Sequence, residues 1–306
     1  MKKLKIRFSI FLIILMFFAS CTIEESSNWD TAEIHKQESQ QEGLQTTTVE
    51  ATETKAREFI REEYQEIAIL TSDGQELDGV FYPASSLNSP LVILLHWAPG
   101  DQTDWREIAF WLQNRGLGGE EEANMEPWLD PSWFPEIDEN WSFNVLVFNF
   151  RGCSGGCSSF NREGWLVDAK SAAEYGFDLE GIDRGQIIMV GASIGADGAA
   201  DACLHINTIH PGSCKGSFSI SPGNYLMLEF QSVVSNLGSV PVWCLYAESD
   251  PESARVCGDF NAANFRAVSY GFNEVRGNGH GMNLVEPDLE PNPLELLRDF
   301  LSEIVE

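Results

Sequence analysis

The chain has 306 residues, of which 43% are hydrophobic and 11% aromatic, and its formal net charge at pH 7 is −28. This length and composition suit one large α/β domain with a buried core and additional tails. The strong negative charge repels the phosphates of nucleic acids and the headgroups of anionic lipids, so we expect neither as a partner.

The first 20 residues have the pattern of an export signal. Four basic residues between positions 2 and 7 precede an uncharged apolar stretch from residue 8 to residue 19. This stretch is short compared with the roughly 20 residues of a membrane-spanning helix. The sequence therefore predicts a signal peptide over residues 1–20. Its cleavage would remove four basic residues and no acidic one, and so change the net charge from −28 to −32.

The end of this segment, "FFASC", resembles a bacterial lipoprotein signal, although Phe18 stands where that pattern favours leucine. The resemblance implies that Cys21 is lipidated and anchors an exported protein outside a bacterial membrane. Ordinary secretion and an uncleaved anchor are the alternatives. Residues 21–58 are rich in Glu, Gln, Ser and Thr, and we expect a disordered tether there, followed by a folded domain over 59–306.

The folded domain is predicted to open with a β-hairpin, because two apolar-containing runs flank the dipeptide Asp73-Gly74. Strands and helices alternate after it, and the strands are apolar on both faces. The expected strands lie at 90–97, 144–152, 186–191, 216–221, 240–247 and 265–271. The expected helices lie at 104–116, 165–178, 225–234 and 292–305, with a further helix of small residues after the strand 186–191. This alternation predicts a mostly parallel, doubly wound sheet with helices on both faces.

An acidic, Trp-rich insertion, residues 117–143, interrupts this alternation. It links a helix to the next strand, so we expect it at the N-terminal edge of the sheet. Ligands of such sheets bind beyond the carboxyl ends of the strands. We therefore interpret the insertion as structural or partner-binding.

Six cysteines remain besides Cys21, and an even number in an exported chain suggests disulfides. The simplest prediction pairs the neighbours in sequence, which are Cys153 with Cys157, Cys203 with Cys214, and Cys244 with Cys257. Zinc is the less favoured alternative, since the spacing lacks the tight CxxC pairs and histidine partners of structural sites.

The segment Gly191-Ala192-Ser193-Ile194-Gly195 fits the G-x-S-x-G pattern between a predicted strand and a predicted helix. The pattern places a serine on a strained corner, where flanking glycines let the strand and the helix approach closely. Ser193 is therefore the candidate nucleophile.

A serine nucleophile requires a base, and the base requires an orienting carboxylate. Asp250 follows the strand "VPVWCLYA", and His280 lies in a glycine-rich loop after the last strand. We expect these two residues to serve Ser193, with Glu248 as the less favoured acid. His96 ends a buried strand and is predicted to organise the backbone.

The tetrahedral oxyanion of acyl transfer requires backbone donors. One is expected from the N–H of Ile194, the residue after the nucleophile. The second is expected from the loop "HWAPGDQTDW", where position favours Ala98 and leaves Trp97 as the alternative.

Taken together, these motifs resemble the α/β-hydrolase superfamily over roughly residues 60–306, nearest to its dienelactone-hydrolase and prolyl-oligopeptidase-like members. The resemblance implies an α/β-hydrolase fold and a serine hydrolase with a Ser-His-Asp triad, without metal or organic cofactor. The loop "NFRG" stands where the family often has Asp-x-Arg-Gly. Since residues 221–240 have room for one helix only, we expect a minimal lid and an open pocket that suits small or polar esters.

Two other functions stay open. A serine peptidase would fit the same motifs, but such peptidases usually add a propeller or a cap, for which we expect no room. A non-catalytic surface-binding protein on a hydrolase fold would use the insertion 117–143 as its working part.

Overall fold

The computed structural model describes residues 62–119, 126–258, 264, 266–275 and 277–305. The chain divides into two units, residues 1–57 and 58–306, and all described residues belong to the second unit. The predicted signal peptide, Cys21 and the predicted tether therefore lie outside the described residues.

An eight-stranded sheet forms the centre of the second unit, with the strand order β1-β2-β4-β3-β5-β6-β7-β8. Its strands are β1 (Gln65–Leu70), β2 (Glu76–Tyr82), β3 (Ser89–Leu95), β4 (Asn144–Phe148), β5 (Ile182–Ala192), β6 (Cys214–Ile220), β7 (Val242–Ala247) and β8 (Ala267–Phe272). β1 and β2 form the predicted hairpin, β2 runs antiparallel to β4, and the pairs from β4 to β8 are parallel. The prediction of a mostly parallel sheet is confirmed.

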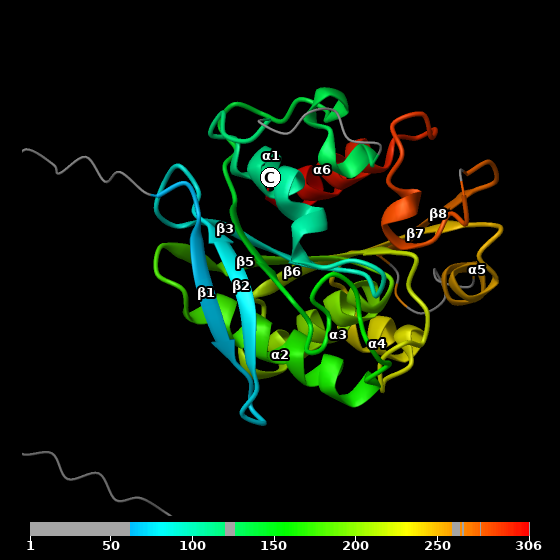
Figure 1. Ribbon diagram of the computed structural model, residues 1–306, viewed down its shortest axis with the longest axis horizontal. Coiled ribbons are helices and arrows are strands. Elements are labelled where there is room, and N and C mark those ends of the chain that lie inside the picture. Colours follow the sequence, from blue (N-terminus) through cyan, green and yellow to red (C-terminus); the bar gives the residue numbers. More distant parts are fainter. Residues whose placement is uncertain (1–61, 120–125, 259–263, 265, 276, 306) are drawn as a thin grey trace, which may run out of the picture. The chain divides into compact units, whose positions relative to one another are not determined.

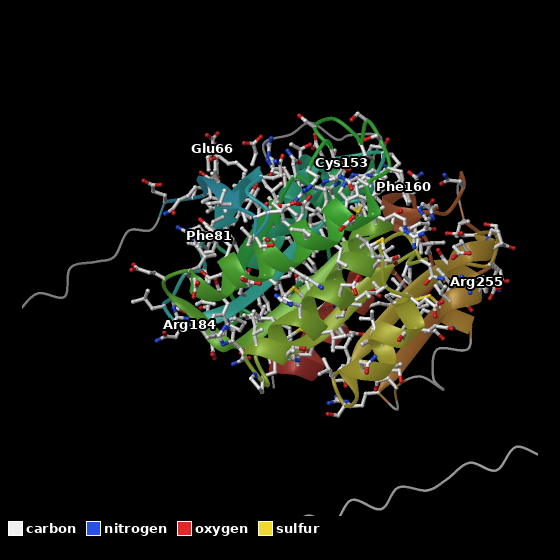
Figure 2. The ribbon with its side chains drawn as sticks, turned by 90° about the horizontal axis from the view of Figure 1, so that it is seen from below. Glu66, Phe81, Cys153, Phe160, Arg184 and Arg255 are labelled. Atoms are coloured by element: carbon white, nitrogen blue, oxygen red, sulfur yellow. A yellow bond between two sulfur atoms is a disulfide. The ribbon has the colours of Figure 1, made fainter. Side chains whose placement is uncertain are left out.

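Helices cover both faces of this sheet. α1 and α6 lie on one face, and α2, α3 and α4 lie on the other (Figure 1); Figure 2 shows the second face with its side chains. The α-helices of the described residues are α1 (Arg106–Gln113), α2 (Arg162–Asp178), α3 (Ile194–Ile209), α4 (Phe230–Leu237), α5 (Pro251–Gly258) and α6 (Pro293–Val305). Short 3₁₀ helices are η1 (Gln102–Trp105), η2 (Pro127–Leu129), η3 (Pro131–Trp133) and η5 (Gly281–Leu284).

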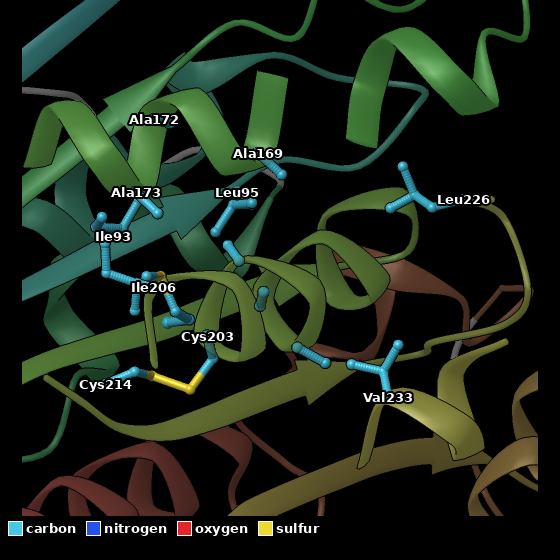
Figure 3. Close-up of a cluster of buried hydrophobic side chains, with 14 of the residues drawn as sticks. Ile93, Leu95, Ala169, Ala172, Ala173, Cys203, Ile206, Cys214, Leu226 and Val233 are labelled. Atoms are coloured by element: carbon cyan, nitrogen blue, oxygen red, sulfur yellow. A yellow bond between two sulfur atoms is a disulfide. The ribbon is translucent and has the colours of Figure 1, made fainter. Parts of the chain in front are cut away.

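The central strands are apolar on both faces because each face meets a different helical layer. Along β3, Leu91, Ile93 and Leu95 pack into the core beneath α2 and α3 (Figure 3). The alternate residues Val92 and Leu94 pack into the core beneath α1 and α6. Since side chains alternate across a strand, a strand buried on both sides needs apolar residues at every position.

All three predicted disulfides are present. Cys203 of α3 bonds Cys214 at the start of β6, with the two Cα atoms 5.3 Å apart. Cys244 of β7 bonds Cys257 of α5, with a Cα separation of 6.1 Å. Cys153 and Cys157 close a short loop after β4. Each bridge therefore joins segments that are close in sequence.

The prediction of a helix over 225–234 is wrong at its start, because α4 begins only at Phe230. The N–H groups of Tyr225 and Leu226 donate to the carboxylate of Asp197 in α3, at 2.6 and 3.3 Å. The Phe230 N–H donates to the Asn224 side chain. The N–H groups of this segment thus donate to side chains and not to helical carbonyls, and these bonds hold the segment as a loop.

Within the part of the chain that the structure describes, no helix has the length and apolar character that crossing a bilayer requires.

Candidate active site

Ser193 occupies a sharp corner between β5 and α3, with φ 53° and ψ −116°. Non-glycine residues rarely adopt such a positive φ, and the strain is held by close packing around the corner. A Cβ atom at Gly191 would overlap the carbonyl of Gly195, and one at Gly195 would overlap the carbonyl of Leu95. The two glycines of the motif are therefore required by sterics, and they bring the start of α3 against the end of β3.

His280 approaches Ser193 from a glycine-rich loop after β8. Its Nε2 lies 2.8 Å from Oγ of Ser193. Gly279 and Gly281 flank it with φ values of 57° and 61°. A Cβ atom at Gly281 would lie 2.6 Å from the indole of Trp97, so the glycine lets this loop pass close to the end of β3.

Asp250 follows β7 and completes the series. Its Oδ2 lies 2.6 Å from Nδ1 of His280. Because a carboxylate accepts, Nδ1 is the protonated nitrogen, and the neutral ring then offers Nε2 as an acceptor for the Ser193 hydroxyl. Burial opposes the ionisation of Asp250, but the hydrogen bonds from His280 and Ser253 outweigh it and lower its pKa below the ordinary value.

The alternative acid, Glu248, is occupied elsewhere. Its Oε1 accepts a hydrogen bond from the Tyr246 hydroxyl at 3.3 Å. Among the five histidines of the sequence, His205 contacts Glu174, and His210 stacks on Phe177. The structure thus brings together Ser193, Asp250 and His280, the three residues singled out from the sequence.

His96 organises the backbone at the end of β3, as predicted. It is fully buried, and its Nε2 accepts a hydrogen bond from the Phe150 N–H at 3.0 Å. Its Nδ1 therefore carries the proton and donates to the carbonyl of Trp97 at 2.7 Å. Burial lowers the pKa of His96 to about 4, which keeps the ring neutral in this role. The loop that follows, which contains Trp97 and Ala98, is fixed through this histidine to the segment just after β4.

Asn149 stands where the family often has aspartate, and it links two loops at this edge. Its Oδ1 accepts a hydrogen bond from the Gln102 N–H at 2.9 Å, just beyond the loop after β3. Two residues on, Arg151 pairs with Asp73 of the hairpin turn at 2.6 Å and with Asp168 of α2 at 2.7 Å. These side chains fix the loops around the site.

Two residues near the site, Ser253 and Asp197, were not predicted from the sequence, and Tyr225 lies beside them. Ser253 of α5 donates to Oδ2 of Asp250 at 2.6 Å. The ring of Tyr225 meets that of His280 edge to face, with centroids 5.9 Å apart. Asp197, one helical turn after the nucleophile, also accepts the Gly223 N–H at 2.8 Å and so holds the loop that carries Tyr225. An acidic residue in a helix of small and apolar residues was the available signal for Asp197.

The insertion is only partly where the sequence placed it. Its end lies at the N-terminal edge, where Phe143 N–H donates to Leu112 and Asn144 pairs with Leu91 of β3. However, Trp128 of η2 packs edge to face on Trp97, with ring centroids 6.1 Å apart, beyond the carboxyl end of β3. The segment thus runs from one edge of the sheet to the other, and the interpretation that the whole insertion lies away from the site is wrong.

Within the described ranges, no three His, Cys, Asp or Glu side chains converge where they could hold a metal ion. The groups at this edge of the sheet are instead a hydroxyl, an imidazole and a carboxylate in series. This arrangement can transfer a proton from the hydroxyl to the ring while the carboxylate stabilises the resulting cation.

No protein-family model matches the chain. An uncharacterized protein of Mycobacterium tuberculosis, in the strains H37Rv and CDC 1551 / Oshkosh, is 26% identical over 133 residues. The aligned part is 43% of this chain and 38% of that protein, so the chain matches less than half the length of the curated relatives.

Solved structures resemble the chain over most of its length. The esterase Pf2001 of Pyrococcus furiosus has a TM-score of 0.56 at 16% identity, covering 80% of this chain and 94% of that one. The α/β hydrolase GrgF of Penicillium sp. sh18 has a TM-score of 0.55 at 11% identity, with 79% and 97% covered. The carboxylesterase EstE1, cloned from a metagenomic library, has a TM-score of 0.54 at 15% identity, with 80% and 90% covered. The chain therefore has the α/β-hydrolase fold, as its motifs implied.

Proposed function

We propose that this protein is a serine hydrolase that cleaves carboxylic esters through an acyl-enzyme intermediate. The observation that carries the proposal is the hydrogen-bonded series from Ser193 through His280 to Asp250, at 2.8 and 2.6 Å. Ser193 lies on the strained corner between β5 and α3, and this position supports its role as the nucleophile. The esterases among the similar structures support an ester as the substrate.

In the first step, Oγ of Ser193 attacks the acyl carbon, and its proton passes to Nε2 of His280. Asp250 holds the imidazole with Nδ1 protonated and stabilises the cation that forms. The imidazolium then donates its proton to the oxygen of the leaving alcohol, and an ester joins the acyl group to Ser193. A water molecule, deprotonated by His280, attacks this ester. The imidazolium then returns the proton to Oγ of Ser193 as the carboxylic acid leaves.

The oxyanion of each tetrahedral intermediate would be received by the N–H groups of Ile194 and Ala98. Ile194 is the first residue of α3, so its N–H has no acceptor within the helix. Gly195 packs against the carbonyls of Leu95 and His96, which keeps the start of α3 beside the loop that carries Ala98. This proximity supports the proposal that both N–H groups serve the same oxyanion, and the loss of one such donor typically lowers kcat by about 10²–10³.

The substrate is proposed to be a small or polar ester. Between β6 and β7 the chain has one short helix, α4, whose Val233 and Val234 pack into the core with α3. A segment buried in this way leaves little chain to cover the site as a lid.

The experiment that tests this function is labelling with a fluorophosphonate, which reacts with activated serines. Labelled wild-type protein, unlabelled Ser193→Ala and turnover of p-nitrophenyl acetate are the expected results. Equal labelling of Ser193→Ala, or none of the native protein, would refute the assignment and favour a non-catalytic binding protein. Faster turnover of an aminoacyl-nitroanilide than of the acetate would favour a peptidase.

Export with lipidation of Cys21 is a separate part of the proposal and depends on the sequence pattern of residues 1–21. In a bacterial host, the wild-type protein should incorporate labelled palmitate and sediment with membranes. Cys21→Ser should do neither. Wild-type protein that stays in the soluble fraction without label would refute the anchor and leave the hydrolase proposal untouched.

A further inference from the structure

A small disulfide-closed loop packs against the loop that would supply the second oxyanion donor. We call residues 153–157 the disulfide loop and residues 97–101 the oxyanion loop. The Cys157 N–H donates to the carbonyl of Ala98 at 2.7 Å, and the Gly155 N–H donates to Oδ2 of Asp101 at 2.7 Å. A Cβ atom at Gly156 would lie 2.9 Å from the carbonyl of Pro99, so the two backbones are in close contact there.

These contacts act on the two peptide planes that flank Ala98. The plane that carries the Ala98 N–H is held by its carbonyl, the Trp97 oxygen, which accepts from His96 at 2.7 Å. The next plane is held by the Ala98 oxygen, which accepts from Cys157. Because peptide units are rigid, fixing both planes fixes the two backbone dihedrals of Ala98 and the direction of its N–H. His96 supplies one constraint and the disulfide loop supplies the other.

The conformation of the disulfide loop depends on its covalent closure. Gly155 and Gly156 have φ values of 69° and 102°, which glycine adopts readily. They lie between Cys153 and Cys157, which are joined by an isolated antiparallel bridge as well as by the disulfide. Without the bond between Cys153 and Cys157, a loop with two adjacent glycines has many other conformations available, and these would release Ala98.

The three disulfides also differ in accessibility. Cys157 is partly exposed, whereas Cys203, Cys214, Cys244 and Cys257 are each at most 1% exposed. The bridge between Cys153 and Cys157 therefore has one partly exposed residue, which favours attack by a thiolate from solution, while both residues of each other bridge are buried.

We propose that the disulfide loop is a positioning element for the oxyanion hole, and that its reduction lowers the activity reversibly. The inference rests on the proposed function of Ser193. A dithiol reductant would act by thiolate attack on Cys157 Sγ, with cleavage of the S–S bond and departure of Cys153 as a thiolate that takes up a proton. The second thiol then displaces Cys157, which leaves two protein thiols and a cyclic disulfide of the reductant. Oxidation restores the bridge, so full activity belongs to an oxidising compartment.

The main test compares two disulfide-deleted proteins. Cys153→Ser/Cys157→Ser removes the disulfide loop's closure, and Cys203→Ser/Cys214→Ser is the matched control, because it deletes a bridge of the core. We expect the first variant to lose about 10-fold in kcat with little change in KM, less than the 10²–10³ that follows complete loss of a donor. A trifluoromethyl ketone, whose adduct with serine is an oxyanion, should bind about 10-fold more weakly. The control should keep wild-type kcat and ketone affinity below its unfolding temperature.

A second measurement uses the wild-type protein and does not depend on the folding of a variant. Brief dithiothreitol treatment, followed by alkylation and peptide mass analysis, should find Cys153 and Cys157 modified first, with kcat falling in proportion and returning on oxidation. Unchanged kcat and ketone affinity, in the protein whose Cys153–Cys157 bond is reduced or deleted, would overturn the inference. Oxidised wild-type protein without any ester turnover would refute the proposed function itself, and this inference with it.

Discussion

Ser253 and His280 donate to the same oxygen of Asp250, Oδ2, and both distances are 2.6 Å. Asp250 directly precedes α5, and its backbone carbonyl accepts the Ala254 N–H at 2.9 Å, as a residue at a helix N-cap does. The carboxylate therefore lies at the positive end of a helix, where a negative charge is favoured. Asp250 thus lies beyond the end of β7, caps α5 and orients the imidazole.

Replacing Ser253 by alanine tests the hydrogen bond that the Ser253 hydroxyl donates to Asp250. A hydrogen bond to a charged group contributes about 1.5 kcal/mol or more, so we expect kcat to fall about 10-fold at unchanged KM. The pKa of Asp250 should rise, because one of the two donors that lower it is lost. Ser235→Ala, at an exposed position of α4, is the control and should match the wild type. Unchanged kcat in Ser253→Ala would mean that His280 alone orients the carboxylate.

The assignment of the acid can be tested by two amide substitutions. Asp250→Asn would present a donor to Nδ1 of His280 and reverse its tautomer, so kcat should fall by about 10⁴. Glu248→Gln should leave kcat within about twofold, because Glu248 contacts Tyr246 instead. Steady-state hydrolysis of p-nitrophenyl acetate measures both. A larger loss in Glu248→Gln than in Asp250→Asn would exchange the roles of the two residues.

The positions of Ser193, Asp250 and His280 were predictable because each follows a strand, and the carboxyl ends of parallel strands meet at one edge of the sheet. The sequence also indicated that these loops could approach one another closely, because glycines such as Gly195 and Gly281 stand where a Cβ atom would collide with a neighbouring segment. The order of motifs along the chain was therefore enough to choose these residues among many serines, acids and histidines.

Two other features depend on contacts between residues far apart in sequence. Residues 225–229 have helical spacing, but their segment is held as a loop by Asp197, which lies 28 residues before Tyr225. Trp128 reaches Trp97 because a long insertion crosses a helical layer, and no periodicity marks where such a segment turns. Local patterns describe strands and helices, whereas these contacts are set by packing.

The contact between Trp128 and Trp97 predicts an effect of the insertion on catalysis. Trp128 is 4% exposed, and Trp128→Ala should lower the free energy of unfolding by about 3–5 kcal/mol. Among the molecules that stay folded, kcat should also fall, because Trp97 supports Gly281 beside His280. Trp133→Ala removes a partly exposed indole of η3 that packs on Phe134, and it should cost less stability and leave kcat unchanged. Chemical denaturation and turnover at low temperature separate the two effects, and equal kcat values in both variants would contradict the prediction.

The two buried carboxylates of α3 predict how stability depends on pH. Burial raises the pKa of Asp197 to about 6 and that of Asp201 to about 7, and the charge of Asp197 adds to the shift of Asp201. Between pH 4 and pH 7 the folded state therefore holds more protons than the unfolded state, so the free energy of unfolding falls as pH rises. Oδ1 of Asp201 has no hydrogen-bond partner among the described residues, whereas Asp197 binds three backbone N–H groups, so Asp201 is the residue to neutralise. Asp201→Asn should leave stability near the wild-type value at pH 4 and raise it by about 4 kcal/mol at pH 8, because the pKa of Asp201 rises from 3.8 to about 7 on folding.

The measurement is urea denaturation at pH 4, 6 and 8, with the difference between variant and wild type plotted against pH. Asp178→Asn, at the exposed end of α2, is the matched control and should run parallel to the wild type from pH 5 to pH 8. The comparison of variants cancels the repulsion that the net charge of −28 adds as pH rises. A stabilisation by Asp201→Asn that is the same at every pH would mean that Asp201 titrates alike in both states. Other groups in the fold would then stabilise the two buried carboxylates. Lys170 is one candidate, because its charge lowers the pKa of Asp201.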